Sequence, residues 1–553
     1  IINDYTKVQE QFAILVSSYC RNTPLINKCF GGIDDYTEIL LPSNILSADN
    51  FICLLNNTPF ITDEDYHTTE LLGWLYQFYI SEKKDEVFES FKKKHKATCD
   101  EVPAATQILT PNWIVKYMVE NTLGRIYLDH DPYANFKDEM KYLVEPCEGE
   151  RPIYEFEEVK DLRCADFSCG SGHILNEFFD LLLKCYEEEG IFGASAIEKI
   201  FKYNILGIDL DTRAKQLSIF SLLLKACQRE KDAFADAHIM PRVLDMPAPI
   251  SMNEAELKAA CLKFIGGYES VVGEELEGCF ELLKDANELG SIMKFELDED
   301  TVAMIRAHFD DWTDGGIDDC PEDIKALLPG VDLILALSEK YSAICMNPPY
   351  MKSANMNDIL KDYIDSNYEE GNPDLYSVFM MMSSNHIEQN GRFSMIVQPT
   401  WLVNSTFAGL RAYLSNDSTF ESLLHMGRGN FGNDWGSIAF TVGNYNSTID
   451  TQFFKLYERT FYRIAPDHIS SLFIVANKNH NARYDFSSYD TSSFNLNDLK
   501  SGRKLYYSCN VDRFNIIPNH PYCYSFNDDI LNTIVNTRIS HSFNPATGLQ
   551  TGD

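Results

Sequence analysis

Short apolar segments alternate with helix-like segments from about residue 160 onward, and this alternation restricts the fold more than any other feature of the chain. Leu162–Phe167 and Tyr203–Leu210 have the composition of buried strands. The helix-like segments that follow them are Ile174–Glu187 and Thr212–Cys227. Strands that alternate with helices build βαβ units, whose strands are parallel. We therefore expect an α/β fold around a doubly wound, mainly parallel sheet.

Two helical regions lie outside this pattern. Residues 1–100 include Thr68–Lys94, where apolar side chains recur near helical spacing, and they predict a helical N-terminal region. Residues from about 251 to 340 are acidic and helix-prone, notably in Asn253–Phe264 and Glu274–Ala286. They predict a helical insertion into the sheet domain, and such insertions usually lie on the surface.

The strand pattern resumes after the insertion. Ser342–Met346 is followed by strand-like segments at residues 392–397 and 437–443. The remainder of the chain is rich in Asn, Ser and Tyr and gives no regular pattern. We therefore expect a sheet domain over residues 101–445 and a C-terminal extension over residues 446–553.

A glycine-rich turn connects the first expected strand to its helix. Its sequence is DFSCGSG over residues 166–172. Glycines let the backbone approach a ligand, and the free amides of a helix N-terminus offer hydrogen-bond donors. A turn of this kind also occurs where a strand and a helix merely pack closely. As a ligand site, the turn supplies these candidates: Asp166, Ser168, Gly170, Ser171 and Gly172.

The next expected strand ends in the sequence GIDLD, residues 207–211. An acidic residue at this position of a Rossmann-like sheet can accept hydrogen bonds from both ribose hydroxyls of a nucleoside. We assign ribose binding to Asp209 and the N-cap of the following helix to Asp211, and we include Leu210 between them in the cofactor site. The alternative is that Asp209 or Asp211 only caps the helix. Because no phosphate-binding lysine lies near the glycine turn, an adenosyl ligand without phosphates fits better than a nucleoside triphosphate.

The most specific motif is Asn347-Pro348-Pro349-Tyr350, at the end of an expected strand. An aromatic amine is a poor nucleophile because its lone pair is delocalised into the ring. The Asn347 side-chain oxygen and the Pro348 carbonyl can each accept a hydrogen bond from such an amine and turn its lone pair toward a methyl group. The prolines fix the backbone, and Tyr350 can stack on an extruded base. The alternative is a turn that simply ends a strand.

In this order the motifs resemble the amino-group DNA methyltransferases, in which the cofactor motif precedes the catalytic one. The segment TQILTPNW, residues 106–113, is similar to the one that closes over the methionine end of the cofactor in that group. The resemblance implies S-adenosylmethionine as cofactor, with Thr106 and Thr110 near its methionine end. Thr110 before Pro111 is also a good N-cap. Phe440 is implied as a second wall of the base pocket.

Three segments resemble the PglX-like adenine-specific methyltransferases of BREX phage-defence systems: Leu71–Phe88, Ala104–Leu128 and residues 548–553. The resemblance spans about residues 60–553. It implies methylation of the N6 amine of adenine in double-stranded DNA. It also implies a longer protein, whose C-terminal region recognises the target sequence, and contacts with other phage-defence proteins.

The chain departs from that group in two places. Asp166 is followed by Phe167 and Ser168 where many relatives have Pro-Pro or Pro-Ala. The contact to the adenine ring of the cofactor has no clear motif. We choose Asp245, in the sequence VLDM, and the alternative is the segment GSI at residues 290–292.

The charge balance conflicts at first sight with a nucleic-acid substrate. The formal net charge is −36, and nucleic-acid-binding proteins usually present a basic face. Residues 341–553 hold 15 basic and 20 acidic side chains, so most of the excess lies in residues 1–340. We therefore expect a DNA-facing surface in the C-terminal part or beyond Asp553.

Several other classes of protein fit poorly. The 15 cysteines lack the spacing of a zinc site, and no carboxylate pattern indicates a nuclease metal site, so we expect no metal. No apolar run is long enough to cross a bilayer, and residues 1–12 do not resemble a signal peptide. We expect a cytoplasmic protein with reduced thiols and no membrane contact.

Two rival functions share the same motifs. A protein glutamine methyltransferase would present a similar planar nitrogen to Asn347, although such enzymes are usually much smaller. A non-catalytic scaffold of a defence complex would keep the cofactor site only for stability. Cofactor binding without methyl transfer would favour the scaffold.

Overall fold

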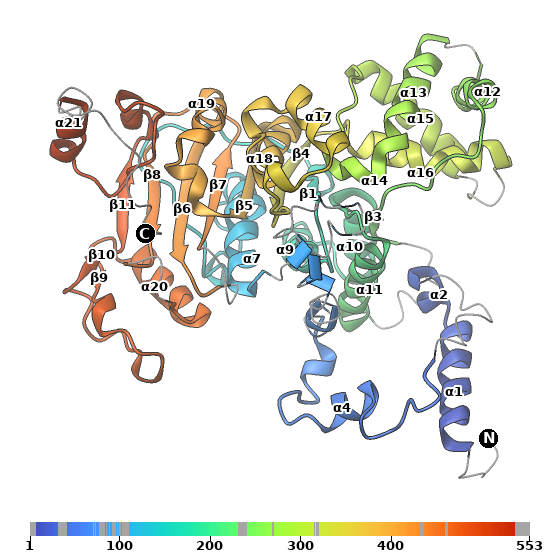
Figure 1. Cartoon of the computed structure of the whole chain (residues 1–553), viewed down its shortest axis with the longest axis horizontal. Helices are drawn as coiled ribbons and strands as arrows, with labels where there is room; N and C mark the ends of the chain where they lie inside the picture. The colour runs from blue at the N-terminus through green and yellow to red at the C-terminus, as the bar shows by residue number, and fades with distance from the viewer. Residues whose placement is uncertain are drawn as a thin grey trace.

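One large mixed sheet organises the chain (Figure 1). The computed structural model describes residues 7–30, 41–69, 71, 73–76, 83–84, 86–87, 89–90, 96, 98, 101, 110–230, 240–267, 270–314, 316, 320–430, 436–458 and 463–536. Within these residues, nine strands form the sheet in the order β11-β8-β6-β7-β5-β4-β1-β2-β3. Its strands are β1 (Cys164–Asp166), β2 (Ile205–Ile208), β3 (Arg242–Leu244), β4 (Tyr341–Met346), β5 (Ile387–Val397), β6 (Thr419–Gly427), β7 (Ser437–Gly443), β8 (Thr451–Lys455) and β11 (Tyr506–Cys509). A separate pair is β9 (Arg483–Tyr484) with β10 (Arg503–Lys504).

The parallel half of the sheet has the order β3-β2-β1-β4-β5. This is the strand order of Rossmann-like folds, in which the chain direction across the sheet reverses between the first and fourth strands. β1 pairs with β2 through Asp166 and Gly207, and with β4 through Ala165 and Ile344. In such sheets ligands bind outside the carboxyl ends of the strands at the reversal point. The expected α/β, Rossmann-like fold is confirmed.

The other half of the sheet is mixed. β7 runs antiparallel to both β5 and β6, β8 is parallel to β6, and β11 is antiparallel to β8. β8 and β11 come from residues after 445 and extend the same sheet. The division of the chain into three regions stays a prediction.

Helices cover both faces of the sheet (Figure 1). Along β4, Ile344 and Met346 join the core beneath the insertion helices, whereas Ala343 and Cys345 join the core on the opposite face. All six residues of β4 are buried, as expected for a central parallel strand. The helices on the second face are α7 (Asn112–Val119), α8 (Arg125–His130), α9 (His173–Glu188), α10 (Gly193–Lys199), α11 (Thr212–Arg229) and α20 (Pro466–Lys478).

The predicted helical insertion is present as a lobe that continues from β3 (Figure 1, green). Asn253 begins its first helix with a capping box, because the Asn253 and Glu256 side chains each accept a hydrogen bond from the other residue's backbone N–H. Its helices are α12 (Glu254–Phe264), α13 (Ser270–Leu282), α14 (Ala286–Leu289), α15 (Glu299–Asp314) and α16 (Glu322–Ala336).

Helical segments also occur at the start of the chain and after β4. The N-terminal helices, coloured blue in Figure 1, project from the side of the sheet domain. They are α1 (Val8–Asn22), α2 (Pro24–Phe30) and α4 (Phe51–Asn57). The later helices are α17 (Asp358–Asn367), α18 (Leu375–His386), α19 (Ala408–Asn416) and α21 (Asp528–Asn536). None of the helices in the described part of the chain combines the length and apolar character needed to cross a membrane.

Candidate active site

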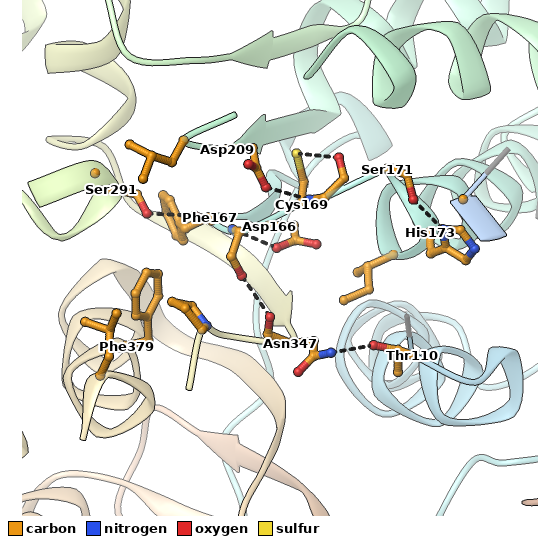
Figure 2. Close-up of a pocket in the computed structure, with 18 of the residues that line it drawn as sticks. Thr110, Asp166, Phe167, Cys169, Ser171, His173, Asp209, Ser291, Asn347 and Phe379 are labelled. Carbon is orange, nitrogen blue, oxygen red and sulfur yellow. Dashed lines mark hydrogen bonds between the residues drawn. The ribbon is translucent and has the colours of Figure 1, made fainter. Parts of the chain in front are cut away.

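The three sequence motifs end at the same edge of the sheet (Figure 2). β1, β2 and β4 are adjacent and parallel, so the glycine turn, Asp209 and Asn347 follow neighbouring carboxyl ends. Ser168 Oγ donates a hydrogen bond to the backbone oxygen of Asn347 at 3.2 Å. Gly170 N donates to Asp209 Oδ2 at 2.8 Å. Direct hydrogen bonds therefore join all three motifs.

A cavity of about 1140 Å³, measured with its open mouth, lies between these motifs. Three carboxylates line the cavity, those of Asp166, Asp209 and Glu288, and its described lining contains no lysine or arginine. Glu288 was not predicted from the sequence. Besides Asp166 and Asp209, the predicted site residues that line the cavity are Thr110, Ser168, Gly170, Ser171, Leu210, Asn347 and Pro349.

Two glycines shape the backbone of the turn beside the cavity, and Gly170 lines it. Gly170 and Gly172 have φ angles of +52° and +85°, a region that other residues rarely adopt. A Cβ atom on Gly172 would lie 2.5 Å from Ser218 Oγ and 3.1 Å from Ser218 Cα on α11. Cys169 N donates to the carbonyl of Ile208 at 3.0 Å and so ties the turn to β2. Both the backbone conformation and the packing therefore require glycine at 172.

Asp166 and Asp209 are held by backbone donors. Asp166 is 1% exposed and accepts from Ser168 N at 3.0 Å, and burial raises the pKa of its carboxyl well above the usual range. Asp209 also accepts from Asp211 N at 2.9 Å, and burial raises its pKa to about 6. Asp211 accepts from Arg213 N at 2.9 Å and caps α11, which confirms its predicted role.

The Asn347 side chain is bonded at both ends. Its Nδ2 donates to Thr110 Oγ1 at 3.0 Å, and Tyr350 donates its hydroxyl to Asn347 Oδ1 at 2.7 Å. The same hydroxyl lies 2.8 Å from the carbonyl oxygen of Ile396. The alternative N-cap role of Thr110 is wrong, because Pro111 holds the N-cap position of α7 with no side-chain cap. Thr110 contacts the Asn347 side chain instead.

Some predicted residues lie elsewhere. Asp245 does not line the cavity; it accepts from Thr212 Oγ1 at 2.7 Å and pairs with Lys215 at 2.6 Å. Phe440 is fully buried in the core on β7 and is also absent from the lining. The cavity lining also lacks Gly172, Pro348 and Tyr350, each of which is next in sequence to a residue that does line the cavity. Thr106 lies outside the described residues.

The cavity has an apolar end that sequence reasoning assigned only in part. The insertion supplies Gly290 and Ser291, the weaker of the two sequence candidates for this end, and Ser291 Oγ donates to the carbonyl of Phe167 at 2.7 Å. Leu375 and Phe379 line it from α18. The available signal was their separation by four residues, about one helical turn, which places them on one face of a helix.

Residues 203–431 match the family model described as Eco57I restriction-modification methylase. The chain is 30% identical over 473 residues to "Adenine-specific methyltransferase BrxX" of Escherichia coli O9:H4 (strain HS), covering 79% of this chain and 38% of that protein. It is 28% identical over 485 residues to "Adenine-specific methyltransferase PglX" of Lacticaseibacillus casei (strain Zhang), covering 84% and 39%. The chain thus spans less than half the length of these curated relatives.

Solved structures that match the chain include a modification subunit of a putative type I restriction enzyme from Vibrio vulnificus YJ016. Its TM-score is 0.38 at 12% identity, with 83% of this chain and 63% of that chain covered. The DrdV–DNA complex gives a TM-score of 0.42 at 10% identity, covering 82% and 34%. The resemblance predicted from the sequence is confirmed by the curated relatives, both of which are named adenine-specific methyltransferases.

Proposed function

We propose that this chain is the catalytic part of an S-adenosylmethionine-dependent DNA methyltransferase that acts on the N6 amine of adenine. The motif at residues 347–350 is called the Asn347 corner below. The observation that carries the proposal is the direct contact of this corner with the glycine turn through Ser168. The names of the two curated relatives support adenine as the target base. Double-stranded DNA recognised through a region outside this chain, other phage-defence proteins as partners, and a cytoplasmic site of action belong to the same proposal.

The charge of the cavity supports S-adenosylmethionine as its ligand. This cofactor carries a sulfonium and an ammonium cation and a single carboxylate. The carboxylates of Asp209 and Glu288 complement these cations, since opposite charges attract strongly where water is excluded. A cation beside the buried Asp166 carboxyl would favour its ionised form. A nucleoside triphosphate would instead bring several negative charges against three carboxylates, with no lysine or arginine in the described lining.

The lining also divides into parts that suit the parts of the cofactor. Asp166 and the glycine turn would hold the methionine portion, and Asp209 would accept from the ribose hydroxyls. Leu210 and Phe379 line the apolar end, which suits an adenine ring. In place of Asp245, we propose the Gly290–Ser291 segment as the further contact at that end.

The Asn347 corner would activate the target amine. Asn347 Oδ1 and the Pro348 carbonyl would accept hydrogen bonds from the amine and favour the tetrahedral nitrogen that forms as its lone pair leaves the ring. When bound, the cofactor supplies an electrophilic methyl group. Because nitrogen becomes acidic as it gains positive charge, no strong base is required, and the proton can leave to water.

The direct test is transfer of labelled methyl from S-adenosylmethionine to DNA by the full-length protein. We expect label in N6-methyladenine, identified by mass spectrometry after digestion of the DNA to nucleosides. Label on a glutamine side chain of a protein would replace this proposal with the protein methyltransferase. Cofactor binding without transfer to DNA or protein would leave the scaffold role.

Cofactor affinity is expected to fall at acidic pH. Burial raises the pKa of Asp209 to about 6, and only its ionised form offers acceptors to both ribose hydroxyls. Affinity should therefore be constant at pH values above this pKa. At lower pH it should fall by about tenfold for each pH unit, if protonation of Asp209 alone prevents binding. Calorimetric titration of the cofactor between neutral pH and pH 5 measures this slope.

Asp209→Asn is the control for that slope. Asparagine keeps the size of the side chain and does not titrate. Its affinity should be weaker at neutral pH and change less with pH than the wild type. Asp166, whose pKa burial also raises, faces the same cavity and accounts for any slope that remains. Equal slopes in the two proteins would contradict the assignment of the pH dependence to Asp209.

A further inference from the structure

The orientation of the Asn347 amide decides whether the corner can act. A side-chain amide has an oxygen that accepts and a nitrogen that donates, and rotation by about 180° exchanges them. With Oδ1 toward the target, Asn347 can accept a hydrogen bond from an amine N–H. With Nδ2 toward the target, two donors would face each other. The proposed activity therefore requires a group that holds this amide in one orientation.

Thr110 is placed to hold it. Its Oγ1 accepts from Asn347 Nδ2 at 3.0 Å, and the residue is 5% exposed (Figure 2). A hydroxyl has one hydrogen and can either donate or accept. When the Thr110 hydroxyl donates that hydrogen to another acceptor, its oxygen can only accept a hydrogen bond from Asn347. The amide is then fixed with Oδ1 on the opposite side.

The acceptor for that hydrogen can come from the cavity. Thr110 lines the cavity together with Ser168 and Ser171, and the described lining has no cationic side chain for a ligand carboxylate. Ser168 already donates to the backbone oxygen of Asn347, and Ser171 pairs with His173 Nδ1 at 3.2 Å. The hydroxyl of Thr110 accepts a bond on the corner side, which leaves its hydrogen for the cavity side.

Tyr350 can release the oxygen that the target needs. Its hydroxyl lies between Asn347 Oδ1, at 2.7 Å, and the carbonyl oxygen of Ile396, at 2.8 Å. The single proton of Tyr350 can move from the first acceptor to the second without loss of a hydrogen bond. Asn347 Oδ1 then becomes available to an incoming amine.

We propose that Thr110 is a positioning residue that couples cofactor binding to catalysis. Its hydroxyl donates to the carboxylate of the cofactor and accepts from Asn347 Nδ2, so an occupied cavity fixes Oδ1 toward the target amine. This inference rests on the proposed function. It adds a link between the cofactor and the catalytic amide to the role that the sequence gives Thr110.

Thr110→Val tests the link, because valine keeps the shape of threonine and lacks the hydroxyl. Thr110→Ser is the matched control that restores it. With the full-length protein on DNA that carries its mapped target site, we expect Thr110→Val to lower kcat by about 10- to 100-fold, since a small misplacement of a reacting group can cost about 100-fold, and Thr110→Ser to recover most of it. KM for DNA should change much less than kcat.

A binding measurement provides a readout apart from turnover. A 2-aminopurine is placed next to the target adenine, so that the target amine is retained and the fluorescence rises when the adenine leaves the stack. Sinefungin, a non-reactive analogue that keeps the carboxylate, should increase this signal in the wild type and in Thr110→Ser. 5′-Methylthioadenosine, which lacks the carboxylate, should not. In Thr110→Val both ligands should leave the signal unchanged.

The outcomes separate this inference from the function beneath it. The positioning role is overturned if the wild type methylates DNA and Thr110→Val keeps the wild-type kcat. It is also overturned if Thr110→Val responds to sinefungin as the wild type does. In both cases the proposed methyltransferase function stands. Failure of Thr110→Ser to restore turnover also overturns the positioning role. If the wild type binds S-adenosylmethionine but methylates neither DNA nor protein, the proposed function and the positioning role of Thr110 both fail.

Discussion

Asn347→Ala is expected to lower methyl transfer by about 10²- to 10³-fold, the cost of removing one hydrogen-bonding group aimed at developing charge. Alanine leaves the target amine with its lone pair in the ring and removes the partner of Thr110. The glycine turn and Asp209 stay in place, because their hydrogen bond to each other does not involve this side chain. Calorimetry should therefore show cofactor affinity within about threefold of wild type, while kcat collapses.

Two further variants make this result specific. Asn347→Asp keeps an acceptor for the amine but cannot donate to Thr110 when ionised, so it should retain more activity than alanine. Asn367→Ala, at an exposed position on α17, should behave as wild type. Loss of cofactor binding together with activity in Asn347→Ala would show that the corner supports the fold of the cavity, and the catalytic assignment would then fail.

Gly172→Ala is expected to weaken cofactor binding by about 10²-fold or more, since displacements near 1 Å at a site have effects of this size. Alanine at φ +85° is strained, and its Cβ would lie 3.1 Å from Ser218 Cα. The hydroxyl of Ser218 can rotate away, but its Cα belongs to α11. The first turn of α9 must therefore shift, and the glycine turn shifts with it. Calorimetric titration of the cofactor measures the loss.

Gly190→Ala separates strain from collision. Gly190 follows the same helix, α9, with φ +76°, and a Cβ there would meet nothing within 4 Å. Both variants bear the cost of a left-handed conformation, about 1–2 kcal/mol. Gly190→Ala should accordingly lower the melting temperature modestly and keep full cofactor affinity. If the two variants bound cofactor equally well, the packing of the turn against α11 would not be what shapes the cavity.

The sequence was sufficient to predict the elements that carry the main motifs. β1, β2 and β4 lie within or overlap the expected strands, and α9 and α11 follow the first two as expected. Because carboxyl ends of parallel strands share one edge of a sheet, the glycine turn, Asp209 and Asn347 could be placed in one site without coordinates. Local hydrophobic pattern and turn chemistry determine these elements, and both can be read from short segments.

Contacts between distant segments could not be predicted in this way. Asp245 and Ser291 were both candidates for the apolar end, and only the path of the insertion back to the sheet brings Ser291 against Phe167. The bond between Thr110 and Asn347 joins residues far apart in the chain, and no local pattern marks it. The extension of the sheet by β8 and β11 likewise depends on pairing between segments with irregular sequence.

The carboxylates that line the cavity also bear on how a reaction cycle ends. Donation of the methyl group converts a sulfonium into a neutral thioether, so the spent molecule carries one positive charge fewer. A unit charge 4 Å from a carboxylate is stabilised by about 1 kcal/mol in water and about 4 kcal/mol near a protein surface. Asp209 and Glu288 would thus bind fresh cofactor more tightly than its by-product. Such a bias would limit product inhibition and promote exchange after every turnover.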